Sequence, residues 1–223
     1  RITERREDVK GFLRKDWYLV KDYWLPYIPI LLFACLVPGT WGGTYILMLA
    51  LALPRATIAS DEVRWDRLAV MLPCRAEEMV RSKYLLYGAC ILFGMVMSAV
   101  SLQTQRMAGR LLTRWWENVF SMTLPDILRY VLLQGGFSLL IAALTVPLYY
   151  RFTARKGAVW GNILVFIFLS AASTVSFNTL YGAPAGTVAL QAAVLAVLAL
   201  TAVWASFRLS VRFYKKRLRG VYQ

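Results

Sequence analysis

The chain has 223 residues, 59% of them hydrophobic, with a mean hydropathy of +0.52 and a formal net charge of +14. This apolar share is higher than in soluble globular domains, so the composition predicts an integral membrane protein. The absence of histidine excludes Ser-His hydrolases and enzymes that hold zinc through imidazole. The three cysteines share no metal-ligand spacing, and we expect no metal site and unpaired structural thiols.

Residues 9–24 are the first predicted element of the chain. Apolar and aromatic side chains are interspersed with charged ones there, and no turn signal follows Gly11. This pattern favours an amphipathic helix that lies in the inner membrane interface and then bends into the membrane. A simple anchoring flank would have the same composition, so both interpretations stay open.

Six apolar stretches predict transmembrane helices. They span residues 25–37, 41–59, 84–102, 130–150, 158–180 and 186–207. A helix needs about 20 residues to cross the hydrocarbon core, so the first stretch is short. We expect it to borrow residues 22–24, or to be tilted and irregular at Pro26 and Pro29. The predicted fold class is therefore an all-α, polytopic integral membrane protein with six transmembrane helices.

Lysine and arginine predict the orientation of these helices. Twenty-two of the 26 basic residues lie in four segments, 1–24, 54–83, 151–157 and 208–223. The alternate connections hold the other four, all within 103–129. By the positive-inside rule, both termini and the connection at 60–83 are expected in the cytoplasm. Because the basic runs flank apolar stretches and not a soluble module, we expect no nucleic-acid partner, and the basic C-terminal tail is expected to contact membrane lipids.

The charged connection after the second stretch predicts two helices separated by a corner. Ser60 is the expected N-cap of the first helix, and Pro73 is expected to end it. The apolar stripe of this helix consists of Trp65, Leu68, Ala69 and Leu72. A second helix is expected to begin near Arg75, to pair Glu77 with Arg81, and to run into the third stretch.

The same connection is a candidate docking surface. A loop needed only to keep positive charge inside would have no use for acids, whereas both signs around an apolar anchor give specificity for a partner. Trp65 is the natural anchor. The alternative is a solvated helix pair with internal ion pairs. The candidate docking residues of this segment are Asp61, Glu62, Trp65, Asp66, Arg67, Leu72, Pro73 and Arg75.

The connection at 103–129 is expected on the opposite side of the membrane. It carries three arginines at helical spacing, followed by two tryptophans: Arg106, Arg110, Arg114, Trp115 and Trp116. This pattern favours an amphipathic helix on the outer leaflet or lining an exit over a disordered loop.

Two absences bear on the energy source. The chain has no Gly-x4-Gly-Lys-Ser/Thr motif, so we expect no cofactor in this chain and an energy source in another subunit or an ion gradient. With Arg55 counted in the 54–83 connection, the six stretches hold no Asp, Glu, Lys or Arg, which argues against an ion-coupled carrier. Polar residues in the stretches more often join helices than bind solutes. The candidate substrate-pathway residues are Met95, Ser98, Gln134, Asn162, Phe177 and Asn178.

Three blocks of sequence carry a resemblance to a known family. They are KGFLRKDWYLVKDYW at 10–24, SDEVRWDRLAVMLPCRAEEMVRSKYL at 60–85 and SFRLSVRFYKKR at 206–217. In order and spacing they resemble the ABC-2 type permeases of Gram-positive bacteria over essentially the whole chain, and phenol-soluble modulin exporters are the first members to compare. The most specific residues are Leu72, Pro73, Arg75, Ser82, Lys83 and Tyr84. The opening Met of the family corresponds to Val9, which predicts a start codon read as Val or an added leader.

The resemblance implies that residues 1–223 form a single ABC-2 type transmembrane domain with a cytoplasmic coupling helix. It implies a non-enzymatic permease subunit in the cell membrane that pairs with itself or with a second permease. Two separate ATPase subunits would carry the ATP and Mg and would dock on the 60–83 connection, with Lys15, Asp16 and Trp17 as a second contact. Because the stretches offer aromatic, methionine and small side chains, the expected cargo is hydrophobic or amphipathic, with peptides first. A non-transporting membrane scaffold or sensor that recruits a cytosolic partner through the same connection is the competing hypothesis.

Overall fold

A computed structural model describes residues 11–21, 28–30, 32–33, 40–60, 76–112, 123–152, 154–182 and 185–220. Five long helices make up most of this part: α2 (Thr40–Ser60), α4 (Ala76–Leu112), α6 (Leu124–Arg151), α7 (Ala154–Gly182) and α8 (Ala185–Gly220). A shorter helix covers residues 11–21, and the described part of the chain contains no strand. The predicted all-α membrane fold is therefore confirmed.

The helices are longer than the apolar stretches that predicted them. Within the described part of the chain, four are long and apolar enough to cross a membrane, over Ala76–Met107, Leu124–Arg151, Val159–Ser176 and Leu190–Leu218. The apolar part of α2, Gly42–Ile58, is shorter. Of the predicted span at 25–37, residues 28–30 and 32–33 are described, and these are helical. The number of six spans stays a prediction.

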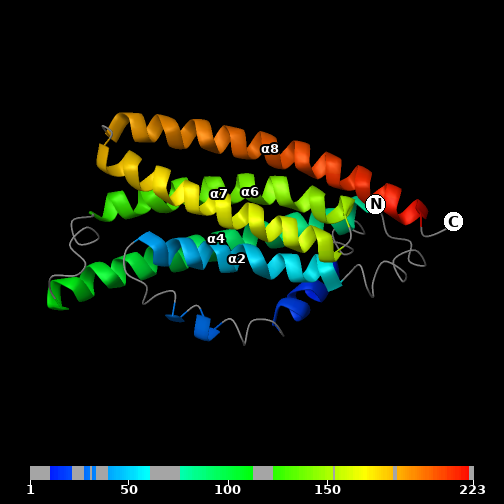
Figure 1. Cartoon of the computed structure of the whole chain (residues 1–223), viewed down its shortest axis with the longest axis horizontal. Helices are drawn as coiled ribbons and strands as arrows, with labels where there is room; N and C mark the ends of the chain where they lie inside the picture. The colour runs from blue at the N-terminus through cyan, green and yellow to red at the C-terminus, as the bar shows by residue number, and fades with distance from the viewer. Residues whose placement is uncertain are drawn as a thin grey trace.

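Helix α6 is the centre of the bundle. The five long helices run side by side along the long axis of the molecule, and α6 contacts each of the other four (Figure 1). In the most apolar stretch of α6, 61% of the residues are buried inside the bundle. The corresponding share is 11% for α8, which lies at the periphery. Small residues permit the close packing: Gly94 of α4 faces Ala50 of α2, and Gly135 of α6 faces Met95. The large apolar side chains on the outer faces suit a surrounding of lipid.

The described parts of the four basic segments lie at one end of the bundle. Helix 11–21, the last turns of α2, α6 and α8 and the first turns of α4 and α7 share this end (Figure 1). We call it the basic end. Arg106 lies near the end of α4 and Arg129 near the start of α6, and both of these helix ends lie far from the basic end. This separation agrees with the charge pattern from which a cytoplasmic basic end is predicted.

The structure corrects the boundaries of two predicted elements. Helix α4 continues without a break to Leu112, so the segment from residue 103 onward begins as an extension of the third stretch and not as a separate helix. The physical reason is that this segment is rich in good helix formers and lacks proline. Ser60, the expected N-cap of the next helix, is the last residue of α2. Trp115 and Trp116 lie outside the described residues.

Candidate functional site

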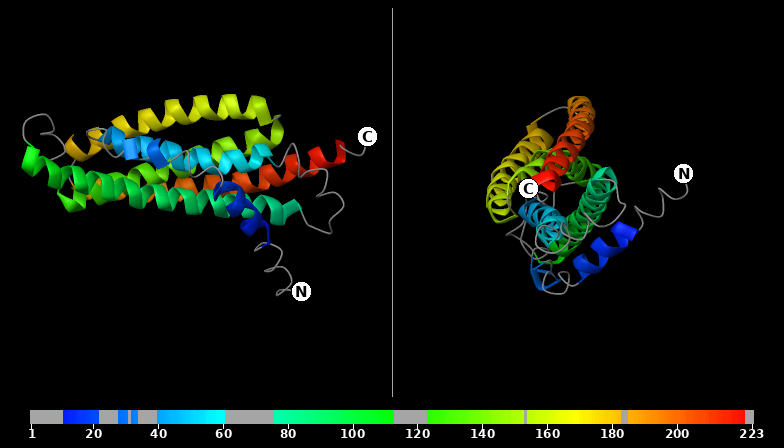
Figure 2. Two further views of the ribbon diagram at one scale, coloured as in Figure 1. Left: turned by 90° about the horizontal axis from the view of Figure 1, so that it is seen from below. Right: turned by 90° about the vertical axis from the view of Figure 1, so that its right-hand side faces the viewer.

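The helix at 11–21 packs against the basic end of the bundle. Figure 2 shows it crossing the bundle obliquely beside the first turns of α4. One face is buried through Phe12 and Val20, while Trp17 and Tyr18 on the other side are more than half exposed. The amphipathic helix expected within residues 9–24 is therefore present, and its exposed aromatic side chains suit a membrane interface.

A buried ion pair fastens this helix to α4. The Asp16 Oδ1 atom lies 2.6 Å from the Lys83 Nζ atom, and the two side chains are 0% and 4% exposed. Ser82 Oγ donates a hydrogen bond to the second carboxylate oxygen at 3.4 Å, and Lys15 Nζ lies 3.5 Å from the first. Charge-assisted hydrogen bonds are stronger than neutral ones, and removing one buried partner leaves an uncompensated charge. The pair therefore joins residues 67 positions apart at the point where α4 begins.

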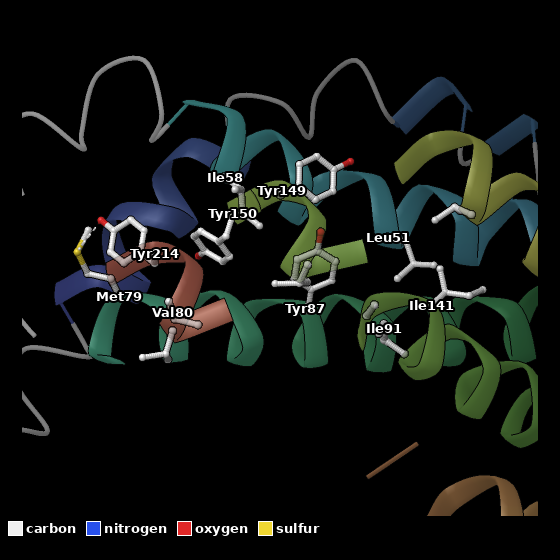
Figure 3. Close-up of a cluster of buried hydrophobic side chains, with 14 of the residues drawn as sticks. Leu51, Ile58, Met79, Val80, Tyr87, Ile91, Ile141, Tyr149, Tyr150 and Tyr214 are labelled. Carbon is white, nitrogen blue, oxygen red and sulfur yellow. Dashed lines mark hydrogen bonds between the residues drawn. The ribbon is translucent and has the colours of Figure 1, made fainter. Parts of the chain in front are cut away.

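The end of α8 is tied to the same part of α4. The hydroxyl group of Tyr84 lies within hydrogen-bond distance of Ser206 and Ser210. Tyr214 donates a hydrogen bond to the sulfur of Met79, as Figure 3 shows. The described parts of the three sequence blocks that carried the resemblance, 10–24, 60–85 and 206–217, therefore meet at the basic end.

Glu77 forms an ion pair that the sequence did not predict. Its carboxylate lies 3.0 Å from the Lys215 ammonium group of α8. The sequence had predicted Arg81, on the same helix as Glu77, as the partner. The expectation of an i,i+4 pair with Arg81 considered only one helix, whereas α8 brings a second basic side chain to the first turn of α4. Both partners are more than half exposed, so this ion pair contributes little to stability.

The predicted docking residues divide into two groups. Lys15, Asp16 and Trp17 lie on the described helix, where Trp17 is exposed and the Asp16 carboxylate is buried against Lys83. Trp17 therefore offers more surface to a partner than Asp16 does. The other candidates lie outside the described residues: Asp61, Glu62, Trp65, Asp66, Arg67, Leu72, Pro73 and Arg75. Their docking role stays a prediction.

A polar cluster lies inside the bundle, among α2, α6 and α7. Thr44 donates a hydrogen bond to Ser173 at 2.9 Å, and the hydroxyl group of Tyr130 lies 3.0 Å from Ser173 and 3.3 Å from Thr44. The Gln134 side-chain amide donates to the same hydroxyl at 3.0 Å. All four side chains are buried. Gln134, a predicted pathway residue, therefore takes part in a network that joins three helices.

Replacing Tyr130 with phenylalanine is expected to destabilise the bundle by about 1 kcal/mol, because the hydroxyl group is the shared partner in this network. The measurement is the unfolding free energy in detergent micelles. Tyr45→Phe is the matched control, since that tyrosine of α2 is exposed. Equal destabilisation by the two substitutions would show that the network contributes nothing.

The other candidate pathway residues are dispersed along the bundle. Met95 packs against Gly135, and Ser98 is buried where α4 approaches Gly43 of α2. Phe177 and Asn178 belong to α7, but their side chains lie outside what the structure describes. The structure thus does not gather the six candidates into a single site among the described residues.

Arg55 is an interior cation that sequence reasoning missed. It lies within α2, is 6% exposed, and donates a hydrogen bond through Nη1 to the Asn162 side-chain oxygen at 2.6 Å. Its Nε and Nη2 atoms are buried and make no hydrogen bond of good geometry within the described part of the chain. The expectation that the apolar stretches hold no ionisable residue is wrong. The missed signal is that Arg55 lies inside the apolar run 41–59, one turn before its end.

Two buried tyrosines surround this guanidinium group. Tyr87 of α4 and Tyr149 of α6 interact with it electrostatically, and both belong to the core cluster drawn in Figure 3. Arg55 therefore places a fixed positive charge between α2, α4, α6 and α7 near the basic end.

Comparison with known proteins identifies one matching family. The family model described as ABC-2 family transporter protein matches residues 11–215. No curated protein and no solved structure matches the chain. The matched range begins at the helix that Asp16 fastens to α4 and ends at Lys215, the partner of Glu77, so it includes all the contacts at the basic end described above.

Proposed function

Because the chain belongs to the ABC-2 transporter family and is a membrane-embedded transporter subunit, we propose that it is the permease of an ATP-driven exporter of amphipathic peptides. Membership implies association with an ABC ATPase component. Two copies of that ATPase would bind the ATP and Mg. A second permease, identical to this chain or different from it, would pair with it in the membrane. The basic end faces the cytoplasm of a Gram-positive cell.

The observation that carries this proposal is the buried pair of Asp16 and Lys83. Residues 61–75 join the end of α2 to the start of α4, and Lys83 lies in the second turn of α4. An ATPase that pushes on this connection, or on the exposed face of helix 11–21, moves one joined body because the ion pair links the two contacts. Helix α4 has 37 residues and a length of about 55 Å, long enough to carry the displacement across the membrane.

Two further sets of hydrogen bonds join the long helices of the bundle. Tyr84 with Ser206 and Ser210 ties α4 to α8, whereas the network around Tyr130 ties α6 to α2 and α7. A transporter that alternates between two states needs elements that make different contacts in each. We infer that ATP binding displaces helix 11–21 together with the start of α4 relative to the other helices.

The side chains inside the bundle support an amphipathic peptide as the cargo. Apolar and small side chains make up most of its described interior, and Arg55 is a buried cation within it. A substrate with long apolar stretches and a few polar groups matches these surroundings better than a small ion or a sugar does.

The test is reconstitution with the partner ABC ATPase. Trp65→Ala and Asp61→Arg are expected to reduce ATPase retention on the purified permease by about tenfold or more and to remove permease-dependent ATP hydrolysis. Trp160→Ala is the matched control, because this tryptophan of α7 is 57% exposed and is not one of the candidate docking residues. Unchanged ATPase coupling in the first two variants would contradict the docking proposal.

Transport is measured with an amphipathic helical peptide in inverted vesicles. The expected result is peptide uptake that needs ATP and the intact permease. If the ATPase binds but no peptide or other amphipathic solute moves, the scaffold hypothesis is favoured. If uptake continues without ATP under an ion gradient, the protein is a secondary carrier and the proposal is wrong.

A further inference from the structure

A groove lies between helix 11–21, α2 and α4 on the side of the basic end. Its volume is about 740 Å³, within the range of ligand pockets. Leu53 of α2 and Leu86, Cys90 and Phe93 of α4 form its floor. This floor is apolar, so the groove suits a hydrocarbon chain.

Two cations border the groove on helix 11–21. Arg14 and Lys21 are exposed and lie seven residues apart, which places them on one face about 10 Å apart along the helix axis. Trp17 lies between them on the same face and is 62% exposed. No acidic residue occurs among the described residues that line the groove. The rim therefore has the charge and geometry to hold an anion above an apolar floor.

The apolar floor continues along α4 away from the basic end. Leu85, Ala89, Leu92 and Val96 recur at intervals of three or four residues and are exposed. Such a row follows one face of the helix, which crosses the membrane. The groove thus joins a cationic rim at the expected headgroup level to an apolar track in the hydrocarbon core.

We propose that this groove binds one anionic phospholipid of the inner leaflet. One acyl chain lies on the floor and extends along α4, and the phosphate lies between the guanidinium group of Arg14 and the ammonium group of Lys21. The charge of the rim favours a lipid over a second copy of the chain, because a chain of net charge +14 brings further positive charge to two cations. The lipid would hold helix 11–21 in the interface together with the Asp16 ion pair.

The first test is native mass spectrometry of the full chain released from bilayers of phosphatidylglycerol and phosphatidylcholine. The expected result is one retained phosphatidylglycerol, with about tenfold or greater loss of occupancy in the double variant Arg14→Gln/Lys21→Gln. Arg208→Gln/Arg212→Gln is the matched control, since it removes two exposed charges of the basic end on α8, away from the groove. Equal loss in both double variants would show general attraction and overturn the proposal.

A second variant tests the floor without changing charge. Ala89→Phe places a large side chain in the groove and is expected to remove the retained lipid while the basic rim remains. Helicity by circular dichroism reports whether this variant folds. Retention of the lipid at the wild-type level in folded Ala89→Phe would overturn the proposed path of the acyl chain.

The third measurement uses Cys90, a cysteine on the floor. In the variant Cys35→Ser/Cys74→Ser it is the remaining thiol, and its reaction with a membrane-soluble maleimide reports access to the groove. We expect slower labelling in phosphatidylglycerol than in phosphatidylcholine, and no such difference after Arg14→Gln/Lys21→Gln. Protection that follows protein concentration and not lipid charge would assign the groove to a second copy of the chain and contradict the proposal.

Discussion

Asp16→Asn is expected to lower the free energy of unfolding by about 3–5 kcal/mol and to release helix 11–21 from α4. The neutral amide removes the carboxylate charge 2.6 Å from the Lys83 ammonium group, in a site where the lysine side chain is 4% exposed. Unfolding in detergent micelles measures the stability loss. Hydrogen exchange of the backbone amides of residues 11–21 measures the release of the helix.

Two further variants separate the ion pair from simple packing. Asp16→Leu/Lys83→Met replaces both charges with apolar side chains and is expected to recover most of the lost stability. Glu77→Gln breaks the exposed pair with Lys215 and is expected to cost less than about 1 kcal/mol. If Asp16→Asn cost no more than Glu77→Gln, the buried pair would not hold the helix and the coupling route through it would be lost.

The second large effect is expected at Asn162. Asn162→Leu removes the acceptor 2.6 Å from Arg55 Nη1 and is expected to destabilise the protein by about 2 kcal/mol, since hydrogen bonds to buried charged groups are stronger than neutral ones. Arg55→Met removes the buried charge itself and is expected to be nearly neutral. Unfolding free energies of the two single variants and the double variant form the measurement.

The double-mutant cycle is expected to give a coupling free energy that differs from zero. Arg55→Met/Asn162→Leu is expected to be more stable than Asn162→Leu, because the leucine no longer faces an unpaired guanidinium group. Additive effects of the two substitutions would show that the hydrogen bond between α2 and α7 has no energetic value. An Arg55→Met variant less stable than Asn162→Leu would show that Asn162 is not the main partner.

Arg55 also bears on whether ATP or an ion gradient is the energy source of transport. The expectation that this protein is not an ion-coupled carrier depended partly on the absence of charges in the apolar stretches, and α2 contains one. Family membership now supports the ATP-driven alternative instead. The vesicle experiment with and without ATP therefore tests the energy source more directly than the charge pattern does.

Much of the fold follows from local patterns in the sequence. Apolar runs long enough to span a membrane predict helices wherever they occur, because the backbone of a membrane span must satisfy its hydrogen bonds internally. The five predicted stretches from residue 41 onward all lie within helices of the structure. Helix 11–21 likewise follows from its alternation of apolar and charged residues, which is also a local property.

The partners of individual side chains do not follow from such patterns. Glu77 was expected to pair within its own helix, yet its ion pair joins it to α8, because that pairing depends on how two helices are rotated against each other. Arg55 was counted in the 54–83 connection, whereas α2 continues to Ser60 and places it inside the bundle. Both errors concern the position of a residue relative to other helices.

The sequence by itself determined the class of this protein: an all-α membrane protein with its basic residues concentrated in alternate connections, and three blocks that resemble ABC-2 permeases. Hydrophobicity and charge decide these properties segment by segment. Only the tertiary structure decided that the described parts of the three blocks meet at the basic end, that Asp16 faces Lys83, and that Arg55 is buried beside Asn162. Such contacts join residues 67 and 107 positions apart, and the packing of the helices, which no single segment encodes, brings them together.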